Sequence, residues 1–164
     1  MPEPKAYFGE KIIFGSHSNK EAYPGLNIIR QIDAEELKKL NSSKVQITSI
    51  PQGLEKAIKW FFCAAAVMRL SHKKRPISML IHTSPRVKIH MVEYKLVLDW
   101  LKNINKDKFI SECKEIYEEE IKKFTKEDLI KAFSDYDFKE SVPDEMPTFG
   151  KISDDIKNIL STIT

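Results

Sequence analysis

The sequence predicts a helix-rich α/β fold, with about five helices packed around a small sheet that contains residues 77–83. Long apolar runs at helical spacing stand on both sides of the β-rich run "ISMLIHT". Only 5 glycines occur, which argues against a sandwich of tight turns. We expect one compact domain, with a strand-and-loop part over 1–50, a helix–strand–helix core over 51–105 and a helical part over 106–164.

The first fifty residues combine strand and turn signals. "AYFGEKIIFGS" holds aromatic and β-branched residues between glycines, which predicts one or two short strands. "LNIIRQI" and "NSSKVQITSI" are further strand candidates. Asp33 is expected to cap a short helix, because Glu36 follows three residues later in a capping-box pattern.

The centre of the predicted core is a long helix that starts after Pro51. One apolar face consists of Leu54, Ile58, Phe61, Ala65 and Met68. Apolar residues cover much of the remaining circumference, which is typical of a helix buried on several sides. The small side chains of residues 64–66 should let another element approach closely.

Four more helices should follow the predicted strand. The first spans about 85–103, with an inward stripe of Val87, Met91, Tyr94, Leu98 and Leu101. The next covers about 106–124, and another begins at Thr125 with Asp128 as its capping partner. Ser153 is expected to cap a short last helix.

Composition excludes several classes of function. The net charge of +3 is too weak to imply nucleic acid, and no glycine-rich phosphate loop occurs. Cys63 and Cys113 match no metal spacing, and Cys63 lies in an apolar run typical of a buried reduced thiol in a cytoplasmic protein. Residues 60–68 are too few for a membrane span, which needs about 20 residues, and no signal peptide is expected.

The sequence predicts no catalytic or metal site. No two of the four histidines have the spacing of a zinc site on a helix. A restriction-type nuclease would place carboxylates and a lysine on a strand around magnesium. The acidic run at 115–120 instead suits helical ion pairs between Glu118 and Lys122 and between Glu119 and Lys123.

The best candidate site is the corner where the predicted strand meets the next helix. Ligands of open α/β sheets bind beyond the carboxyl ends of strands, which favours residues 83–86 over the basic turn at 73–75. Ser84 can cap the helix, whose free N–H groups suit an anion. Arg86, Lys88 and His90 add basic groups for a nucleic-acid phosphate.

Two segments of the sequence are "SIPQGLEKAIKWFFCAAAVMRL" and "ISMLIHTSPRVKIHMVEYKLVLDWL". They resemble the Z-one domain family of bacterial proteins, and the clear similarity covers about residues 50–102. The matching positions are Ile50-Pro51, Ala57-Ile58 and Ser78-Met79-Leu80-Ile81-His82, with Tyr7, Gly9 and Phe14 nearer the start. The resemblance marks Met79 and His82 as characteristic residues and assigns them no role.

The resemblance implies a helicase-like ATPase of superfamily two, described as an endonuclease and linked to restriction-modification and phage defence. It places "ISMLIHTS" as the first strand of a second RecA-like lobe whose following turn faces nucleic acid. ATP and magnesium are expected for the parent protein. None is expected in this segment, because the motor's Walker loop is missing.

The leading expectation is therefore a non-catalytic segment of an ATP-dependent DNA-processing enzyme. It would contact DNA through the corner at 83–90 and contact other domains of its parent, with no membrane partner. The alternative is a helical interaction module that holds neighbouring domains through residues 106–137. A self-contained nuclease would nick plasmid with magnesium, which we do not expect.

Overall fold

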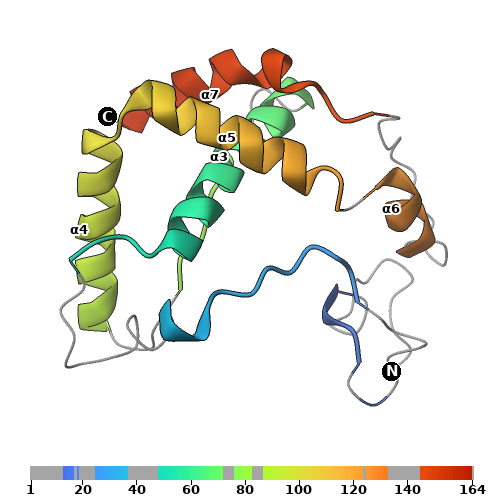
Figure 1. Cartoon of the computed structure of the whole chain (residues 1–164), viewed down its shortest axis with the longest axis horizontal. Coiled ribbons are helices and arrows are strands. Elements are labelled where there is room, and N and C mark those ends of the chain that lie inside the picture. The colour runs from blue at the N-terminus through green and yellow to red at the C-terminus, as the bar shows by residue number, and fades with distance from the viewer. Residues whose placement is uncertain are drawn as a thin grey trace. The chain divides into compact units, whose positions relative to one another are not determined.

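The computed structural model describes residues 13–16, 18, 25–36, 48–71, 76–82, 87–123, 125–132 and 145–163. The helices in these ranges are α3 (Gln52–Ser71), α4 (Val87–Asn103), α5 (Lys106–Glu120), α6 (Lys126–Ala132) and α7 (Phe149–Ile163), as Figure 1 shows. The chain forms two compact units. One comprises Met1–Gln31 with Glu119–Met146, and the other comprises Ile32–Glu118 with Pro147–Thr164.

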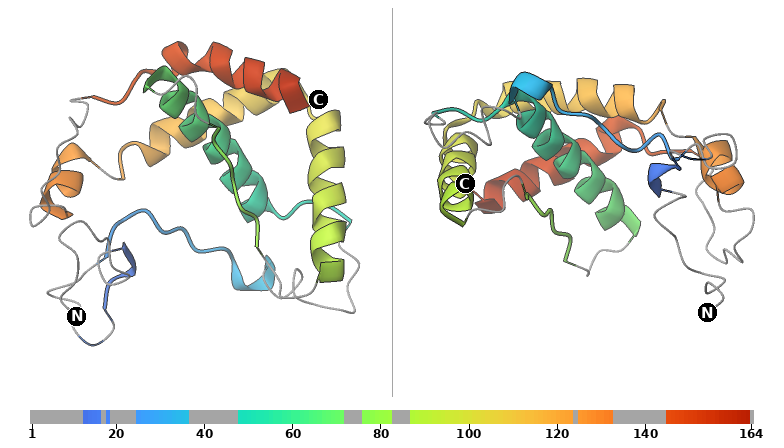
Figure 2. Two further views of the ribbon diagram at one scale, coloured as in Figure 1. Left: turned by 180° about the vertical axis from the view of Figure 1, so that it is seen from behind. Right: turned by 90° about the horizontal axis from the view of Figure 1, so that it is seen from below.

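The core of the larger unit lies where α3 packs against α7 (Figures 1 and 2). Ile152, Ile156 and Leu160 recur every four residues on α7 and are almost fully buried. The buried residues of α3 are Leu54, Ile58, Phe62, Cys63, Ala65 and Ala66. They extend round the helix, which confirms the prediction of a core helix covered on several sides. No helix of the described ranges is both long and apolar enough to span a bilayer.

Aromatic side chains connect α5 to its neighbours. The ring of Phe109 lies edge-on to Phe62 of α3, with centroids 5.2 Å apart, and 5.9 Å from Trp100 of α4. Tyr117 stacks on Trp60 at 6.3 Å, and its hydroxyl donates a 2.6 Å hydrogen bond to the carbonyl oxygen of Pro147. Such pairs add specific geometry to the burial of large apolar area. They fix α5 against α3 and anchor the segment that leads into α7.

The start of α3 is capped by a residue distant in sequence. Asp33 accepts hydrogen bonds from the backbone of Glu35 and Glu36, as its predicted capping role requires. The Glu36 carboxylate then accepts bonds from the backbone N–H groups of Gln52 and Gly53, each at 3.0 Å. A negative charge there also suits the helix dipole. A Cβ on Gly53 would lie 2.8 Å from Glu36 Oε2, so glycine leaves room for this cap.

The predicted α/β fold class is wrong, since the described residues contain helices but neither a strand nor a sheet. Residues 76–82 run as coil, drawn without an arrow in Figures 1 and 2. A strand requires a neighbour to bond its backbone, and the other described strand candidates supply none. Residues 26–32 form a turn and coil, and residues 13–14 are helical. A small sheet in a RecA-like lobe therefore has no basis in the described part of the chain.

Helix α4 presents a different face to the core from the predicted one. Leu101 is buried and Leu98 half-buried, but Met91 and Tyr94 of the same stripe are 53% and 59% exposed. Glu93 is buried instead. Helix α4 carries apolar residues on more than one side, and the contact of Trp100 with Phe109 fixes which side turns inward.

Two predicted helix starts have opposite outcomes. Thr125 and Asp128 form a reciprocal capping box before α6, with the Asp128 Oδ2 atom accepting from the Thr125 N–H at 2.8 Å. In return the Thr125 hydroxyl accepts from the Asp128 N–H at 3.2 Å. By contrast, α7 begins at Phe149, so Ser153 lies inside the helix, where its hydroxyl bonds the Gly150 carbonyl.

The smaller unit contains an ion cluster around the buried Glu120. Arg30 contacts one carboxylate oxygen through two nitrogens, at 2.7 and 2.5 Å. Lys123 contacts the other oxygen at 2.8 Å. Burial tends to raise the pKa of Glu120, but these two cations outweigh burial and lower it. The cluster thereby ties residues near 30 to the end of α5.

Candidate nucleic-acid interface

The structure describes only part of the predicted corner. Ser84 and Arg86 lie outside the described residues, and Lys88 belongs to the first turn of α4 with its side chain outside them. His90 is half-buried on α4. Of the family-characteristic residues, Met79 is half-buried and His82 is exposed, both in the coil before the corner.

Two of the predicted residues meet across the corner. The rings of His82 and His90 lie with centroids 5.2 Å apart and planes inclined by 39°. They belong to the coil that enters the corner and the helix that leaves it. Each imidazole carries a donor or acceptor nitrogen at either side of the ring, so the pair can stack and bond polar groups. The contact brings together the two segments that flank residues 83–86.

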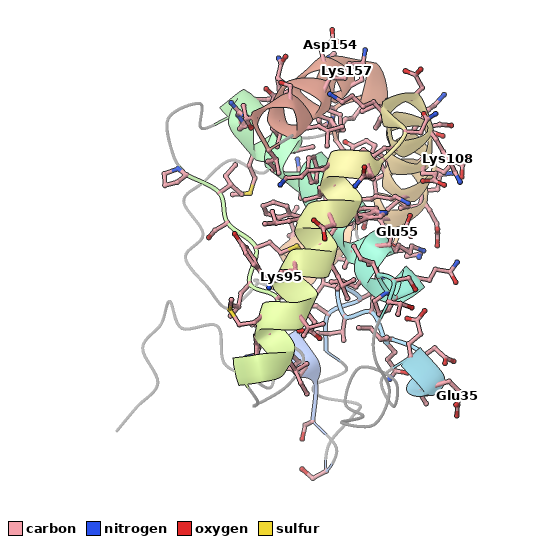
Figure 3. All side chains as sticks on the ribbon, turned by 90° about the vertical axis from the view of Figure 1, so that its left-hand side faces the viewer. Glu35, Glu55, Lys95, Lys108, Asp154 and Lys157 are labelled. Atoms are coloured by element: carbon pink, nitrogen blue, oxygen red, sulfur yellow. The ribbon has the colours of Figure 1, made fainter. Side chains whose placement is uncertain are left out.

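Beyond His90, the outward side of α4 combines apolar and basic groups. Met91, Val92 and Tyr94 are exposed large apolar residues, and Lys95 of the same helix is exposed as well. Figure 3 labels Lys95. A lysine can contact phosphate, and an exposed aromatic ring can stack on a base. This side of α4 therefore combines groups of the kinds that contact phosphates and bases.

A separate polar cluster lies inside the core. The Lys59 ammonium binds the carboxylates of Glu55, one turn earlier on α3, and Glu112 of α5, the latter at 2.7 Å. Lys59 is only 5% exposed, and its ammonium lies 5.9 Å from the centre of the Trp100 ring. A second cation, Lys108, stands 3.7 Å from Glu112. Figure 3 labels Glu55 and Lys108 of this cluster.

The partners of Lys59 decide its charge state. Burial by itself lowers the pKa of Lys59, but the hydrogen bonds to Glu112 and Glu55 outweigh burial and raise it. The hydrogen bond from Lys59 in turn lowers the pKa of Glu112. Lys59 and Glu112 therefore stay ionised at neutral pH, which suits a structural ion cluster rather than a proton-transfer site.

The two cysteines face each other where α3 meets α5. Both thiols are free and completely buried. The sulfur of Cys63 lies 3.5 Å from the carbonyl oxygen of Cys113, and that of Cys113 lies 3.8 Å from the carbonyl oxygen of Lys59. Hydrogen bonding with Cys63, together with burial, raises the pKa of Cys113 above its ordinary value. Both thiols are therefore free groups buried in the core, as predicted for Cys63.

The acidic residues of α5 serve mainly in ion pairs. Lys123 contacts Glu119 at 2.5 Å, which confirms one predicted pair. Glu118 lies 3.9 Å from Lys114, one turn before it, and not in the predicted pair with Lys122. Within the described ranges, no three His, Cys, Asp or Glu side chains gather in a way that could hold a metal ion.

Sequence reasoning missed the cluster around Lys59. The lysine interrupts "AIKWFFCAAAV", an apolar run in which a charge needs a partner once it is buried. Glu55 stands four residues before it, at the spacing of a helical ion pair. Those two signals were available, but the role of Glu112 depends on how α5 packs on α3.

Comparison with known proteins identifies a family for this chain but no individual relative. The family model of the Z1 domain, written Z-one above, matches residues 53–164, well over half of the chain. The match extends the resemblance beyond the segment at 50–102 to the whole of α5, α6 and α7. No curated protein and no solved structure matches the chain.

Proposed function

Because the chain belongs to the Z1 domain family, we propose that it is a non-catalytic segment of a larger ATP-dependent DNA-processing enzyme. The parent would be a helicase-like protein linked to endonuclease function, restriction-modification and phage defence, and would use ATP and magnesium elsewhere. This segment would contact the DNA backbone through the corner formed by His82, Ser84, Arg86, Lys88 and His90.

The contact between His82 and His90 carries this proposal. It brings the histidine that the family resemblance marks close to His90 of α4, which supports a shared polar site at this corner. The exposed Tyr94 and Lys95 continue the same chemistry along α4. Arg86 would add a charge-assisted bond to phosphate, which is stronger than a neutral one.

Fluorescence anisotropy with a labelled DNA duplex tests the proposal. Affinity should fall steeply with salt, because each phosphate contact releases counterions. Arg86→Ala should reduce the slope of log affinity against log salt by about one unit, and Lys88→Ala by a similar amount. Both should weaken different sequences equally, since a phosphate contact does not discriminate between bases.

Lys157→Ala is the matched control, because it removes one positive charge from the outer surface of α7 (Figure 3). It should leave the salt slope unchanged. Absence of binding at low salt, or equal effects of Lys157→Ala and Arg86→Ala, would contradict the proposed contact. Plasmid nicking by the isolated chain with magnesium would contradict the non-catalytic role.

A helical interaction module at 106–137 is the second candidate. It is favoured by Ile130 of α6, a large apolar side chain that is 53% exposed among charged neighbours. Size-exclusion chromatography with light scattering separates the two candidates. A stable assembly that Ile130→Asp dissociates, without affinity for DNA, would favour the module.

A further inference from the structure

Two histidines from different segments present their rings to each other. His82 belongs to the coil at 76–82 and His90 to α4, and their ring centres lie 5.2 Å apart with planes inclined by 39°. His82 is exposed and His90 is half-buried, so solvent and dissolved ions reach the pair. The nitrogen of a neutral imidazole is the commonest metal ligand in proteins. A pair of imidazoles at the surface is therefore a candidate metal site.

The separation of the rings fits one shared metal ion. When two imidazole nitrogens bind one zinc ion tetrahedrally at about 2.0–2.1 Å each, the two ring centres lie about 5 Å apart. The rings of His82 and His90 already have this separation. Rotation of the exposed His82 ring can present either of its nitrogens, because this terminal torsion has broad, two-fold preferences. Each ring also keeps a second nitrogen for a hydrogen bond, as metal-bound histidines usually do.

We propose that His82 and His90 together bind one divalent transition-metal ion such as Zn²⁺, which would connect the coil at 76–82 to α4. Imidazole suits zinc, copper and nickel, whereas magnesium and calcium prefer oxygen ligands. Among the described residues, no third His, Cys, Asp or Glu side chain joins the pair. Two ligands are fewer than the three or four of resident zinc sites, so water would fill the other positions and the ion would exchange.

The inference goes beyond the proposed contact with DNA, because it needs only the two histidines and no nucleic acid. The sequence pattern predicts no such site, since residues 82 and 90 do not have zinc-site spacing on one helix. The pair arises from the approach of a coil to α4, which is a tertiary contact.

Isothermal titration calorimetry of the full chain tests the site with zinc chloride and, separately, with magnesium chloride. We expect about one zinc ion per chain and no binding of magnesium, because two nitrogen ligands select a transition metal. A chain that binds no zinc at millimolar concentration would overturn the proposal. Half an ion per chain would also overturn it, since the ion would then lie between two copies. Equal binding of magnesium would show that carboxylates hold the ion instead.

Alanine variants locate the ion. His82→Ala and His90→Ala should each weaken zinc affinity at least about tenfold, because even residues that only orient a metal ligand contribute about 10–100-fold. His82 is exposed, so His82→Ala should keep the circular dichroism and thermal midpoint of the natural chain. This variant decides the result if His90→Ala disturbs α4. Unchanged zinc affinity in a folded His82→Ala chain would exclude the pair as the site.

His72→Ala is the matched control, because it removes another of the four histidines of the chain. It should leave zinc affinity unchanged. If it weakens binding as much as His82→Ala does, the ion is not held by the proposed pair.

Thermal melts with and without zinc give a second readout. An ion that binds the folded chain raises the thermal midpoint of the natural chain, and it should not do so for His82→Ala. A zinc-induced rise of the same size in both chains would contradict the site. Measurements of DNA binding are made with a metal chelator present, so that failure of the metal site and failure of the DNA contact give separate results.

Discussion

The crossing of α3 with α7 and the region around Leu80 contain similar apolar side chains that differ in solvent exposure. At the crossing, Ile152, Ile156 and Leu160 are almost wholly covered. Around the corner, Leu80 and Tyr94 remain mostly exposed, although sequence patterns placed both regions inside the fold. The first region supplies stability by burial of apolar area. Within the described part of the chain, the second region has apolar side chains like those of a core but leaves them exposed.

The largest expected effect comes from opening the packed region. Phe109→Ala removes a ring that contacts Phe62 and Trp100 and leaves a cavity between three helices. We expect a loss of about 3–5 kcal/mol in the free energy of unfolding, measured by urea denaturation. A loss below about 1 kcal/mol would show that this core is loosely packed.

Removing the buried cation should cost less. Lys59→Met keeps the length of the side chain but leaves the carboxylates of Glu55 and Glu112 without their shared partner. Both are partly exposed, so we expect about 2 kcal/mol rather than the larger value of a fully buried pair. Glu119→Gln at the surface pair with Lys123 is the control and should cost under about 1 kcal/mol.

The same cluster should give the core an acid dependence. Because the pKa of Glu112 is lowered by folding, its contribution is complete above the ordinary carboxyl pKa and is lost as pH falls through the lowered one. Glu112→Gln should therefore weaken the decline of stability on acidification, measured by thermal melts between neutral pH and pH of about 3. An unchanged pH profile would contradict the role of Glu112.

The cap that Glu36 forms on α3 should make a smaller contribution to stability than the packed core does. Glu36→Ala removes the acceptor for the N–H groups of Gln52 and Gly53, so we expect a loss of about 1 kcal/mol. Glu36→Gln retains one acceptor oxygen and should recover part of that loss. If the two variants are equally unstable in urea, the carboxylate does not act as a cap.

The smallest effect should come from the uncovered side of α4. Met91→Ser replaces an exposed apolar side chain, so stability should change by less than about 0.5 kcal/mol. A loss of several kcal/mol would mean that another part of the molecule covers this residue, and the contrast between the two regions would disappear.

Much of the helical organisation could be predicted from local signals. Asp33 and the pair of Thr125 and Asp128 cap helices as their spacing predicts. The long run after Pro51 forms the core helix. The candidate corner was predicted only in part, because the contact between His82 and His90 depends on how the coil approaches α4. The outward orientation of Met91 and Tyr94 was not predictable from a helix with apolar residues on several sides.

The sequence by itself determined where helices form, because a helix satisfies its backbone hydrogen bonds within one continuous segment. The sequence also identifies the family, because the family model matches residues 53–164. Only the tertiary structure decided that residues 76–82 run as coil, that Glu36 caps a helix sixteen residues away, and that Lys59 meets Glu112. Each of these depends on contacts between segments far apart in the chain, and no local periodicity encodes which segments come together.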